Sequence, residues 1–313
     1  MIIINPIGDN LQVGTRIHWD EATRSLYYVD LPQSTIYRYK PASNLITKAK
    51  VGDQPLAFAF PVKGKTDRFI AGLGRNIVIL KWDGETDSVC HCTTVCEVDA
   101  HPDKAKNRLN GAKVDPFGRL WVGTMGPQDE NGLTVPGLGS LYSVTKGSCT
   151  RHLSNIGISN GLAFDVDNKK MYYIDTLFPG VYQFDYDGEH GEISNQKELF
   201  TFKKHDIQGL PDGLTIDREG NLWVTALQSA SIIHFDPKKG EVLKTIHMPT
   251  PQVTSITFGN DKLNILYVTT AKLPIDGKIP DEPAGCTFKL ENVHIKGAPG
   301  YSYKYKDDDD QAV

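Results

Sequence analysis

The sequence has few of the features that would indicate a disulfide-rich, membrane-spanning or nucleic-acid-binding protein. Its 313 residues include only five cysteines, a sparse and odd-numbered set, which argues against a disulfide framework and favours a reducing compartment. No run approaches the ~20 apolar residues of a membrane helix, and residues 1–7 lack the basic and apolar regions of a secretory signal. The net charge is −4 and no basic cluster occurs. We therefore expect a cytoplasmic protein that binds neither membranes nor nucleic acid.

Amphipathic helical patterns longer than about two turns are also missing, and a repeat of short strands takes their place. Each unit has a short strand, a turn containing glycine or asparagine, and an apolar strand rich in aromatic and β-branched residues. These apolar strands are predicted at residues 25–30, 119–124, 170–175, 221–225 and 265–269. A degenerate sixth unit spans residues 57–80. The period of roughly 40 to 55 residues is that of four-stranded propeller blades.

Six such units nearly fill the chain, so the sequence predicts an all-β fold, a six-bladed β-propeller of four-stranded antiparallel blades. The propeller is expected to be a single domain over residues 1–300. Residues 301–313 include four consecutive aspartates, Asp307 to Asp310, and are expected to form an acidic, disordered tail or the remnant of an affinity tag.

Four polar residues occupy the same place in four repeats. Each lies five residues before an aspartate that ends a first strand: Thr15, Asn110, Asn160 and Asp212. Asn-Gly and Asp-Gly dipeptides by themselves are typical of turns. Four polar residues in phase, however, converge at one mouth of the central channel, which favours a site. Carboxylate and amide oxygens form a hard ligand set that suits Ca²⁺, Mg²⁺ or Mn²⁺.

A cysteine cluster offers a weaker alternative for a metal site. Cys90, His91, Cys92 and Cys96 lie close together, but their spacing matches no standard zinc pattern. Because the cluster falls where an outer blade strand is expected, we interpret it as strand and loop residues.

The chain resembles the family of senescence marker protein 30, also called regucalcin, with the gluconolactonases and the firefly luciferin-regenerating enzyme, and it looks closest to arthropod members. The resemblance covers almost the whole chain. Its densest motifs are Asn107-Arg108-Leu109-Asn110, Lys113-Val114-Asp115-Pro116, Gly139-Ser140-Leu141-Tyr142, Gly157-Ile158-Ser159-Asn160-Gly161-Leu162, Leu210-Pro211-Asp212-Gly213 and Leu266-Tyr267-Val268-Thr269-Thr270.

The resemblance implies a hydrolase that opens small, sugar-acid-like lactones at a divalent cation in the channel mouth. Carried over by matching motif, Asn160 and Asp212 are metal ligands and Asn110 is an amide at the metal site. Arg108 and Asn110 contact the substrate. Asp212 is also the catalytic general base. Ca²⁺ is the expected ion, with Zn²⁺, Mn²⁺ or Mg²⁺ as alternatives, and the expected partner is a small-molecule substrate.

The sequence departs from the family at the first blade. Thr15 stands where the family has a metal-ligating glutamate, and Arg16 adds a positive charge beside it. Because the number of anionic ligands sets the affinity of a Ca²⁺ site, three interpretations remain open. The metal binds weakly and hydrolysis continues, Arg16 enters the site and replaces the metal, or catalysis is lost and the mouth only binds ligands. Arg16 alone is equally compatible with a position in solvent.

Three functional hypotheses follow. The first is a lactonase with Asp212 as the base, and the second is a non-catalytic, regucalcin-like binding or regulatory protein. The third is a luciferin-regenerating type of enzyme that acts on a specialised small molecule. Residues 126–139 are expected to form a lid, in which Gln128, Asp129 or Glu130 supplies a substrate contact.

Overall fold

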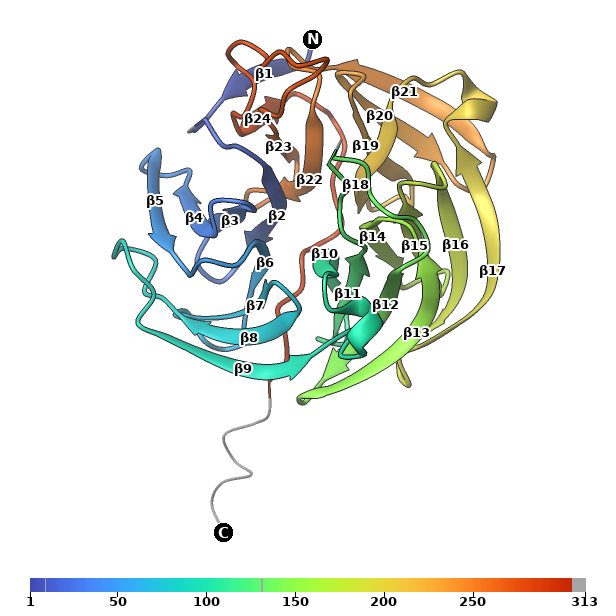
Figure 1. Ribbon diagram of the computed structural model, residues 1–313. Coiled ribbons are helices and arrows are strands. Elements are labelled where there is room, and N and C mark those ends of the chain that lie inside the picture. The colour runs from blue at the N-terminus through green and yellow to red at the C-terminus, as the bar shows by residue number, and fades with distance from the viewer. Residues whose placement is uncertain (9, 131, 306–313) are drawn as a thin grey trace.

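Six four-stranded antiparallel sheets are arranged around a central axis in the computed structural model, which describes residues 1–8, 10–130 and 132–305 (Figure 1). Blade 1 contains β2 (Gly14–Asp20), β3 (Ser25–Asp30), β4 (Thr35–Lys40) and β5 (Leu45–Lys50). Blade 2 contains β6 (Leu56–Pro61), β7 (Arg68–Leu73), β8 (Asn76–Lys81) and β9 (His91–Glu97). Blade 3 contains β10 (Arg108–Val114), β11 (Leu120–Met125), β12 (Gly139–Thr145) and β13 (Ser148–Ile156).

The other three blades complete the ring. Blade 4 contains β14 (Ser159–Asp165), β15 (Lys170–Asp175), β16 (Gly180–Asp187) and β17 (Glu192–Thr201). Blade 5 contains β18 (Leu210–Ile216), β19 (Leu222–Leu227), β20 (Ser231–Asp236) and β21 (Glu241–His247). Blade 6 contains β22 (Val253–Gly259), β23 (Ile265–Thr270), β24 (Phe288–Glu291) and β1 (Ile3–Pro6). The predicted six-bladed propeller is confirmed.

The repeated aspartates at the ends of the inner strands fix the first turn of their blades. Asp115 Oδ1 accepts hydrogen bonds from the backbone N–H groups of Phe117 and Arg119, and its Oδ2 accepts one from the Trp121 indole. Asp217 makes the corresponding bonds in blade 5, to two turn N–H groups and the indole of Trp223. These bonds satisfy buried backbone donors, which explains why the aspartate recurs in phase.

The inner strands begin earlier than the sequence indicates. Arg108, Ser159 and Leu210 are the first residues of β10, β14 and β18, so the predicted site residues lie inside strands and not in the loops before them. Each of these strands contains a register shift against its neighbour at the site residue. A β-bulge leaves its extra residue unpaired, and the interrupted pairing made these residues look like loop positions.

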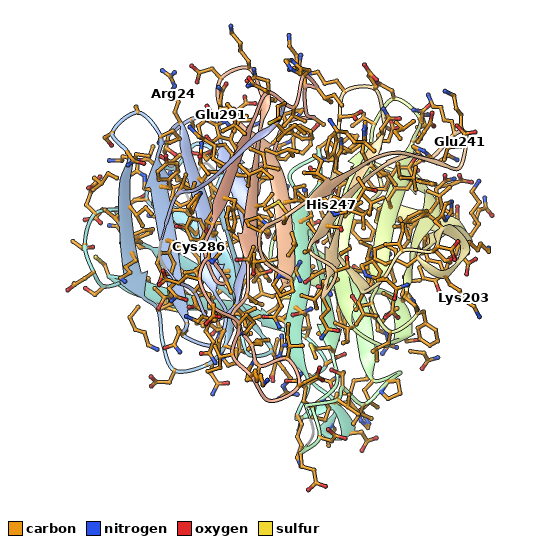
Figure 2. The ribbon with its side chains drawn as sticks, turned by 90° about the horizontal axis from the view of Figure 1, so that it is seen from above. Arg24, Lys203, Glu241, His247, Cys286 and Glu291 are labelled. Atoms are coloured by element: carbon orange, nitrogen blue, oxygen red, sulfur yellow. A yellow bond between two sulfur atoms is a disulfide. The ribbon has the colours of Figure 1, made fainter. Side chains whose placement is uncertain are left out.

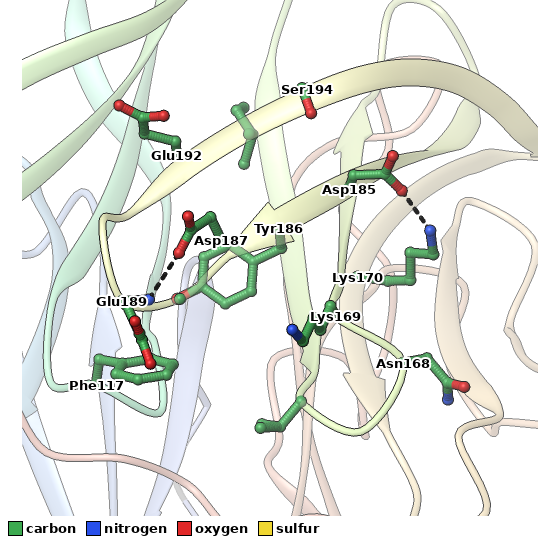
Figure 3. A pocket seen from close by; sticks show the side chains of 13 residues that line it. Phe117, Asn168, Lys169, Lys170, Asp185, Tyr186, Asp187, Glu189, Glu192 and Ser194 are labelled. Carbon is green, nitrogen blue, oxygen red and sulfur yellow. Dashed lines mark hydrogen bonds and ion pairs between the residues drawn. The ribbon is translucent and has the colours of Figure 1, made fainter.

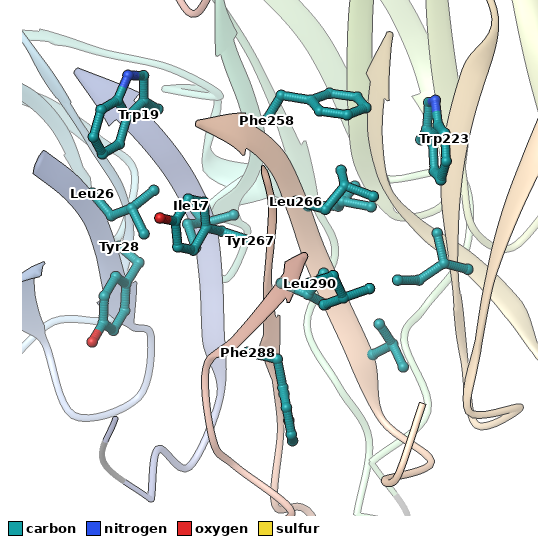
Figure 4. Close-up of a cluster of buried hydrophobic side chains, with 14 of the residues drawn as sticks. Ile17, Trp19, Leu26, Tyr28, Trp223, Phe258, Leu266, Tyr267, Phe288 and Leu290 are labelled. Atoms are coloured by element: carbon teal, nitrogen blue, oxygen red, sulfur yellow. The ribbon is translucent and has the colours of Figure 1, made fainter. Parts of the chain in front are cut away.

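Buried side chains between the blades provide the core. In one cluster the rings of Trp19 and Tyr267 are stacked, with centroids 6.3 Å apart, and join blade 1 to blade 6 (Figure 4). Phe258 packs edge-on against Trp223 at 5.6 Å and joins blade 6 to blade 5. Burying side chains of this size stabilises the fold by roughly 1.5–3 kcal/mol each. Charged residues such as Arg24, Lys203 and Glu241 lie at the periphery (Figure 2).

The two ends of the described chain both join the ring. Strand β1 pairs with β24 and so completes blade 6. After β24 the chain crosses the centre of the ring (Figure 1), where Gly297 pairs with Asp217 and Tyr303 pairs with Val62. Tyr303 is fully buried. Residues 301–305, which the sequence analysis assigned to the tail, therefore pack against the blades, and residues 306–313 lie outside the described residues.

The cysteines differ from the sequence-based expectation in one respect. Cys96 and Cys149 form a disulfide between the outer strands β9 and β13, although the sparse, odd-numbered set argued against disulfides. The two residues lie 53 positions apart in sequence, and adjacency of blades 2 and 3 brings them together. Cys92 lies in the exposed outer strand β9, as expected. None of the described helical segments is long and apolar enough to span a membrane.

Candidate functional site

The bulges of three inner strands direct Asn110, Asn160 and Asp212 to the channel. In each case the next residue is a glycine with no room for a side chain. A Cβ on Gly111 would lie 2.3 Å from Asn160 O, and a Cβ on Gly213 would lie 2.5 Å from Thr254 O. These backbone contacts bring the inner strands close together, and the three polar side chains converge as the in-phase spacing predicted.

Blade 1 is built differently at the same place. Gly14 pairs with Asp30 as Ser159 pairs with Asp175, so Thr15 is the counterpart of Asn160 and Arg16 is the counterpart of a glycine. Arg16 adopts a φ of 49°, in the left-handed region that L residues rarely occupy. Its strand bulge and this unusual backbone direct the side chain into the channel, where it is 5% exposed.

The Arg16 guanidinium lies among the predicted site residues. Its Nη2 donates to Asn160 Oδ1 at 2.6 Å, and its Nε donates to Asn110 O at 3.1 Å. Its Nη1 lies 3.9 Å from Asp212 Oδ1. Burial lowers the pKa of Arg16, and the attraction of Asp212 opposes that shift. Arginine remains charged in such a setting, so a fixed cation occupies the centre of the ring.

A hydrogen-bond network fixes the positions of the Asn110 and Asn160 side chains beside Arg16. Asn110 Nδ2 donates to Asn160 Oδ1 at 3.0 Å and to Ser159 O at 2.8 Å. Asn160 Nδ2 donates to Thr176 Oγ1 at 2.7 Å, and Thr176 in turn donates to Pro211 O. Thr176 was not predicted as a site residue, although it directly follows β15, the strand that pairs with the Asn160 strand. The network fixes both amides with their oxygens toward cations.

Arg108 is linked to the same network. Its Nη1 donates to Asn110 Oδ1 at 2.9 Å and to Leu109 O at 3.1 Å. Burial, with a smaller contribution from repulsion by Arg16, lowers the pKa of Arg108 to about 10. Arg108 has no carboxylate partner among the described residues. It is therefore available to a polar or anionic ligand at the mouth.

Asp212 is the one carboxylate in this group. Its side chain is only 11% exposed, and its carboxylate accepts no hydrogen bond from a described residue. Burial raises the pKa of Asp212 to about 6, and the attraction of Arg16 lowers it in part. A carboxylate with this pKa is ionised at neutral pH and basic enough to take a proton from water.

The residues around Arg16 do not fit a divalent cation. Ca²⁺ needs six to eight oxygen ligands, several of them anionic, and this group contains a single carboxylate. Asn160 Oδ1 already accepts from Arg16 and Asn110, and the guanidinium lies between Asn160 and Asp212. No group of three or more His, Cys, Asp or Glu side chains able to hold a metal occurs among the described residues. The predicted ligands thus surround an arginine.

Next to Arg16 the channel contains a small basic cavity of about 20 Å³. Its lining comes from all six inner strands and from Tyr301 of the C-terminal segment. It includes Arg16, His18 and Lys113, and none of the lining residues is acidic. His18 and Lys113 were not predicted as channel residues, although both are polar residues of inner strands.

His18 is expected to make the protein sensitive to acid. Burial lowers its pKa from 6.5 to about 4, the charge of Asp20 raises it, and repulsion from Lys113 lowers it further. Between these pH values the unfolded chain binds a proton that the folded chain does not, so stability falls as the pH falls. Between pH 6.5 and about 4, the free energy of unfolding falls by on the order of 3 kcal/mol because of His18. Urea unfolding of wild type and His18→Gln from pH 7 to pH 4 measures it.

The difference between the two proteins isolates the histidine. Asp212, whose folded pKa is raised, stabilises the folded state as the pH falls toward 4, but it does so in both proteins. We expect His18→Gln to lose less stability than wild type, while His101→Gln, at an exposed position, follows wild type. Parallel curves for wild type and His18→Gln would contradict the assignment.

The predicted lid forms a small hairpin between β11 and β12. Gln128 pairs with Thr134, Gln128 Nε2 donates to Gly132 O, and Asp129 Oδ1 accepts from Leu133 N. These polar groups therefore take part in the hairpin itself. The hairpin exposes Leu133 (67%) to solvent. Its role in covering the mouth stays a prediction.

A larger groove of about 850 Å³ lies elsewhere, between the turns of blades 3 and 4 (Figure 3). Four charged residues at this groove form ion pairs, Lys170 with Asp185 and Asp187 with His190. None of the predicted site residues lines it. The channel gathers buried charged groups whose pKa values are shifted mainly by burial, Arg16, Arg108 and Asp212, which is typical of functional sites.

Comparisons with known proteins agree with this architecture. The family model described as "SMP-30/Gluconolactonase/LRE-like region" matches residues 13–272. Regucalcin of Gallus gallus is 34% identical over 298 residues, which cover 94% of this chain and 96% of that protein. A solved luciferin-regenerating enzyme is 39% identical with a TM-score of 0.91, covering 97% of this chain and all of that one.

A more distant structure has the same fold. It is described as a calcium-binding protein, regucalcin, of Agrobacterium tumefaciens, and it is 22% identical with a TM-score of 0.83 over 96% of each chain. With the propeller and the convergent channel residues described, the family model and the regucalcin relatives lead to one conclusion: the chain belongs to the SMP-30/gluconolactonase/LRE-like family.

Proposed function

We propose that this protein hydrolyses small lactones by a metal-independent reaction at the channel mouth. The observation that carries the proposal is the pairing of a buried, basic carboxylate, Asp212, with a fixed cation, Arg16, at 3.9 Å. Membership of a family that includes gluconolactonases supports lactones as the substrate class.

In the proposed reaction Asp212 acts as the general base. It takes a proton from a water molecule as that water attacks the lactone carbonyl carbon. Negative charge then develops on the carbonyl oxygen, and N–H groups of Arg16 stabilise it. As the ring C–O bond breaks, the leaving alkoxide regains the proton from Asp212, which gives a hydroxy acid.

Two neighbouring residues supply the polar contacts that a hydroxylated substrate requires. The Arg108 guanidinium has N–H donors that hydrogen-bond substrate hydroxyls. Asn110 holds both Arg108, through its Oδ1, and Arg16, through its backbone oxygen. We therefore propose Arg108 as a substrate-binding residue, with Asn110 orienting both guanidinium groups.

A panel of sugar and aliphatic lactones, assayed with EDTA and then with added Ca²⁺, Mn²⁺, Mg²⁺ or Zn²⁺, tests this function. We expect turnover with EDTA present and little change on adding metal, because Arg16 occupies the position that a cation needs. Activity that requires a metal contradicts the metal-independent reaction. No turnover of any lactone in any condition contradicts the hydrolase.

The second candidate function is a non-catalytic, regucalcin-like binding protein. The observation that favours it is that Arg16 is bonded to Asn160 and Asn110 and holds Asp212 in an ion pair, as in a site closed by its own side chain. The third, a luciferin-regenerating type of reaction, is supported by the 39% identity to an enzyme of that name. Both predict no lactone turnover. We further propose a small molecule as the partner and a cytoplasmic location.

A further inference from the structure

The basic cavity next to Arg16 is lined by two cationic side chains and no acidic one, and the proposed reaction does not explain this excess of positive charge. Arg16 and Lys113 both line it, and each is close enough to influence the other. The carboxylate of Asp212, 3.9 Å from the Arg16 guanidinium, partly offsets the charge of Arg16. Lys113 has no hydrogen bond or ion pair to any described residue. Lys113 is half-buried, and withdrawing an ammonium group from water without a partner is unfavourable.

A third nitrogen of the same cavity also lacks a partner. His18 is 6% exposed, and its Nε2 finds no hydrogen-bond partner among the described residues. Phe60 packs against the ring edge-on at 5.6 Å, and Gly300 of the C-terminal segment lies next to it. An ammonium group and an imidazole nitrogen, both without partners, therefore line one small space.

The size of the cavity limits what can fill it. A volume of about 20 Å³ holds one water molecule or one monatomic ion, and it excludes phosphate, sulfate and organic carboxylates. A water molecule would accept hydrogen bonds but would leave the lysine charge uncompensated. A monatomic anion satisfies the donors and offsets the charge together.

We infer that the central channel binds a halide ion, chloride under ordinary conditions, between Arg16, His18 and Lys113. These three residues line the cavity together with Tyr301 and residues of the six inner strands. The ion would be a structural component that makes the buried cations compatible with the fold. It is separate from the proposed lactone site, because Asp212 and Arg108 do not line the cavity.

Stability measured at constant ionic strength tests this inference. Urea unfolding is compared in sodium chloride and in sodium isethionate, whose anion is too large for the cavity. We expect stability that rises with chloride and then saturates, since chloride binds only the folded state. For a dissociation constant of about 10 mM, 150 mM chloride raises the folded-to-unfolded ratio about 16-fold.

Two variants and one crystal experiment make the test decisive. Lys113→Met removes the cation while keeping side-chain length and should abolish the saturable response, whereas Lys203→Met, at an exposed position, should keep it. Bromide soaked into wild-type crystals should give an anomalous peak between Arg16, His18 and Lys113, a result that does not depend on whether Lys113→Met folds. Equal stability in the two salts, or bromide found only outside the channel, overturns the inference. Neither readout involves lactone turnover.

Discussion

Replacement of Asp212 by asparagine is expected to reduce lactone turnover by about 10²–10⁴-fold, the usual contribution of a general base. The amide keeps the size of the side chain but cannot take a proton from water. The measurement is kcat/KM of wild type and Asp212→Asn at pH 7.5. Asp206→Asn is the matched control, because Asp206 is exposed and its φ of 52° suits asparagine.

The pH dependence gives this prediction a second readout. Burial raises the pKa of Asp212 to about 6, and the ionised form is the active base. Wild-type kcat/KM should therefore rise with pH through about 6 and reach a plateau near neutrality, with a tenfold fall per pH unit below the pKa. Because Arg16 lowers this pKa, an Arg16→Gly variant should shift the profile to higher pH. Asp212→Asn with unchanged activity would remove Asp212 from the mechanism.

The double variant Thr15→Glu/Arg16→Gly is expected to convert the arginine-centred ring into a Ca²⁺ site. Thr15 is the counterpart of Asn160, so a glutamate there adds a second carboxylate opposite Asp212. A glycine at position 16 removes the guanidinium and matches Gly111 and Gly161 in the neighbouring blades. Isothermal titration should show a dissociation constant of about 10⁻⁵–10⁻³ M, where wild type shows no binding.

The single variants separate the two changes. Thr15→Glu alone should bind no metal, because the new carboxylate would form an ion pair with Arg16. Arg16→Gly alone should bind weakly, with one carboxylate present. Saturating Ca²⁺, at 100 times its dissociation constant, should stabilise the double variant by about 2.7 kcal/mol. Tight Ca²⁺ binding by wild type would show that Arg16 does not exclude the metal.

The sequence predicted the fold and the convergence of the site because both follow from a repeat. Residues at equal offsets, such as Asn160 and Asp212, must meet in a ring of equivalent blades. The second strands at Ser25–Asp30 and Lys170–Asp175 agree with the prediction because their aromatic and β-branched runs are uninterrupted. The inner strands were predicted too short because a bulge and a glycine at positions 160 and 161 resemble a turn.

The position of the Arg16 side chain could not be predicted from the sequence. It depends on a φ of 49° and on the close packing of neighbouring glycines, neither of which leaves a pattern in the chain. The three interpretations of Thr15 and Arg16 were therefore equally open, and the structure favours the one in which Arg16 enters the site. The pairing of Cys96 with Cys149 likewise depends on the adjacency of two blades.

The pairing of β1 with β24 has a consequence for synthesis. The strand made first, Ile3–Pro6, completes a sheet whose other three strands are made last. On the ribosome β1 must wait without its partner until Phe288–Glu291 has emerged, so the ring stays open during nearly the whole of translation. Final closure is thus a post-translational event that brings β1 and β24 together, and a nascent chain exposes the unpaired edges of these strands until then.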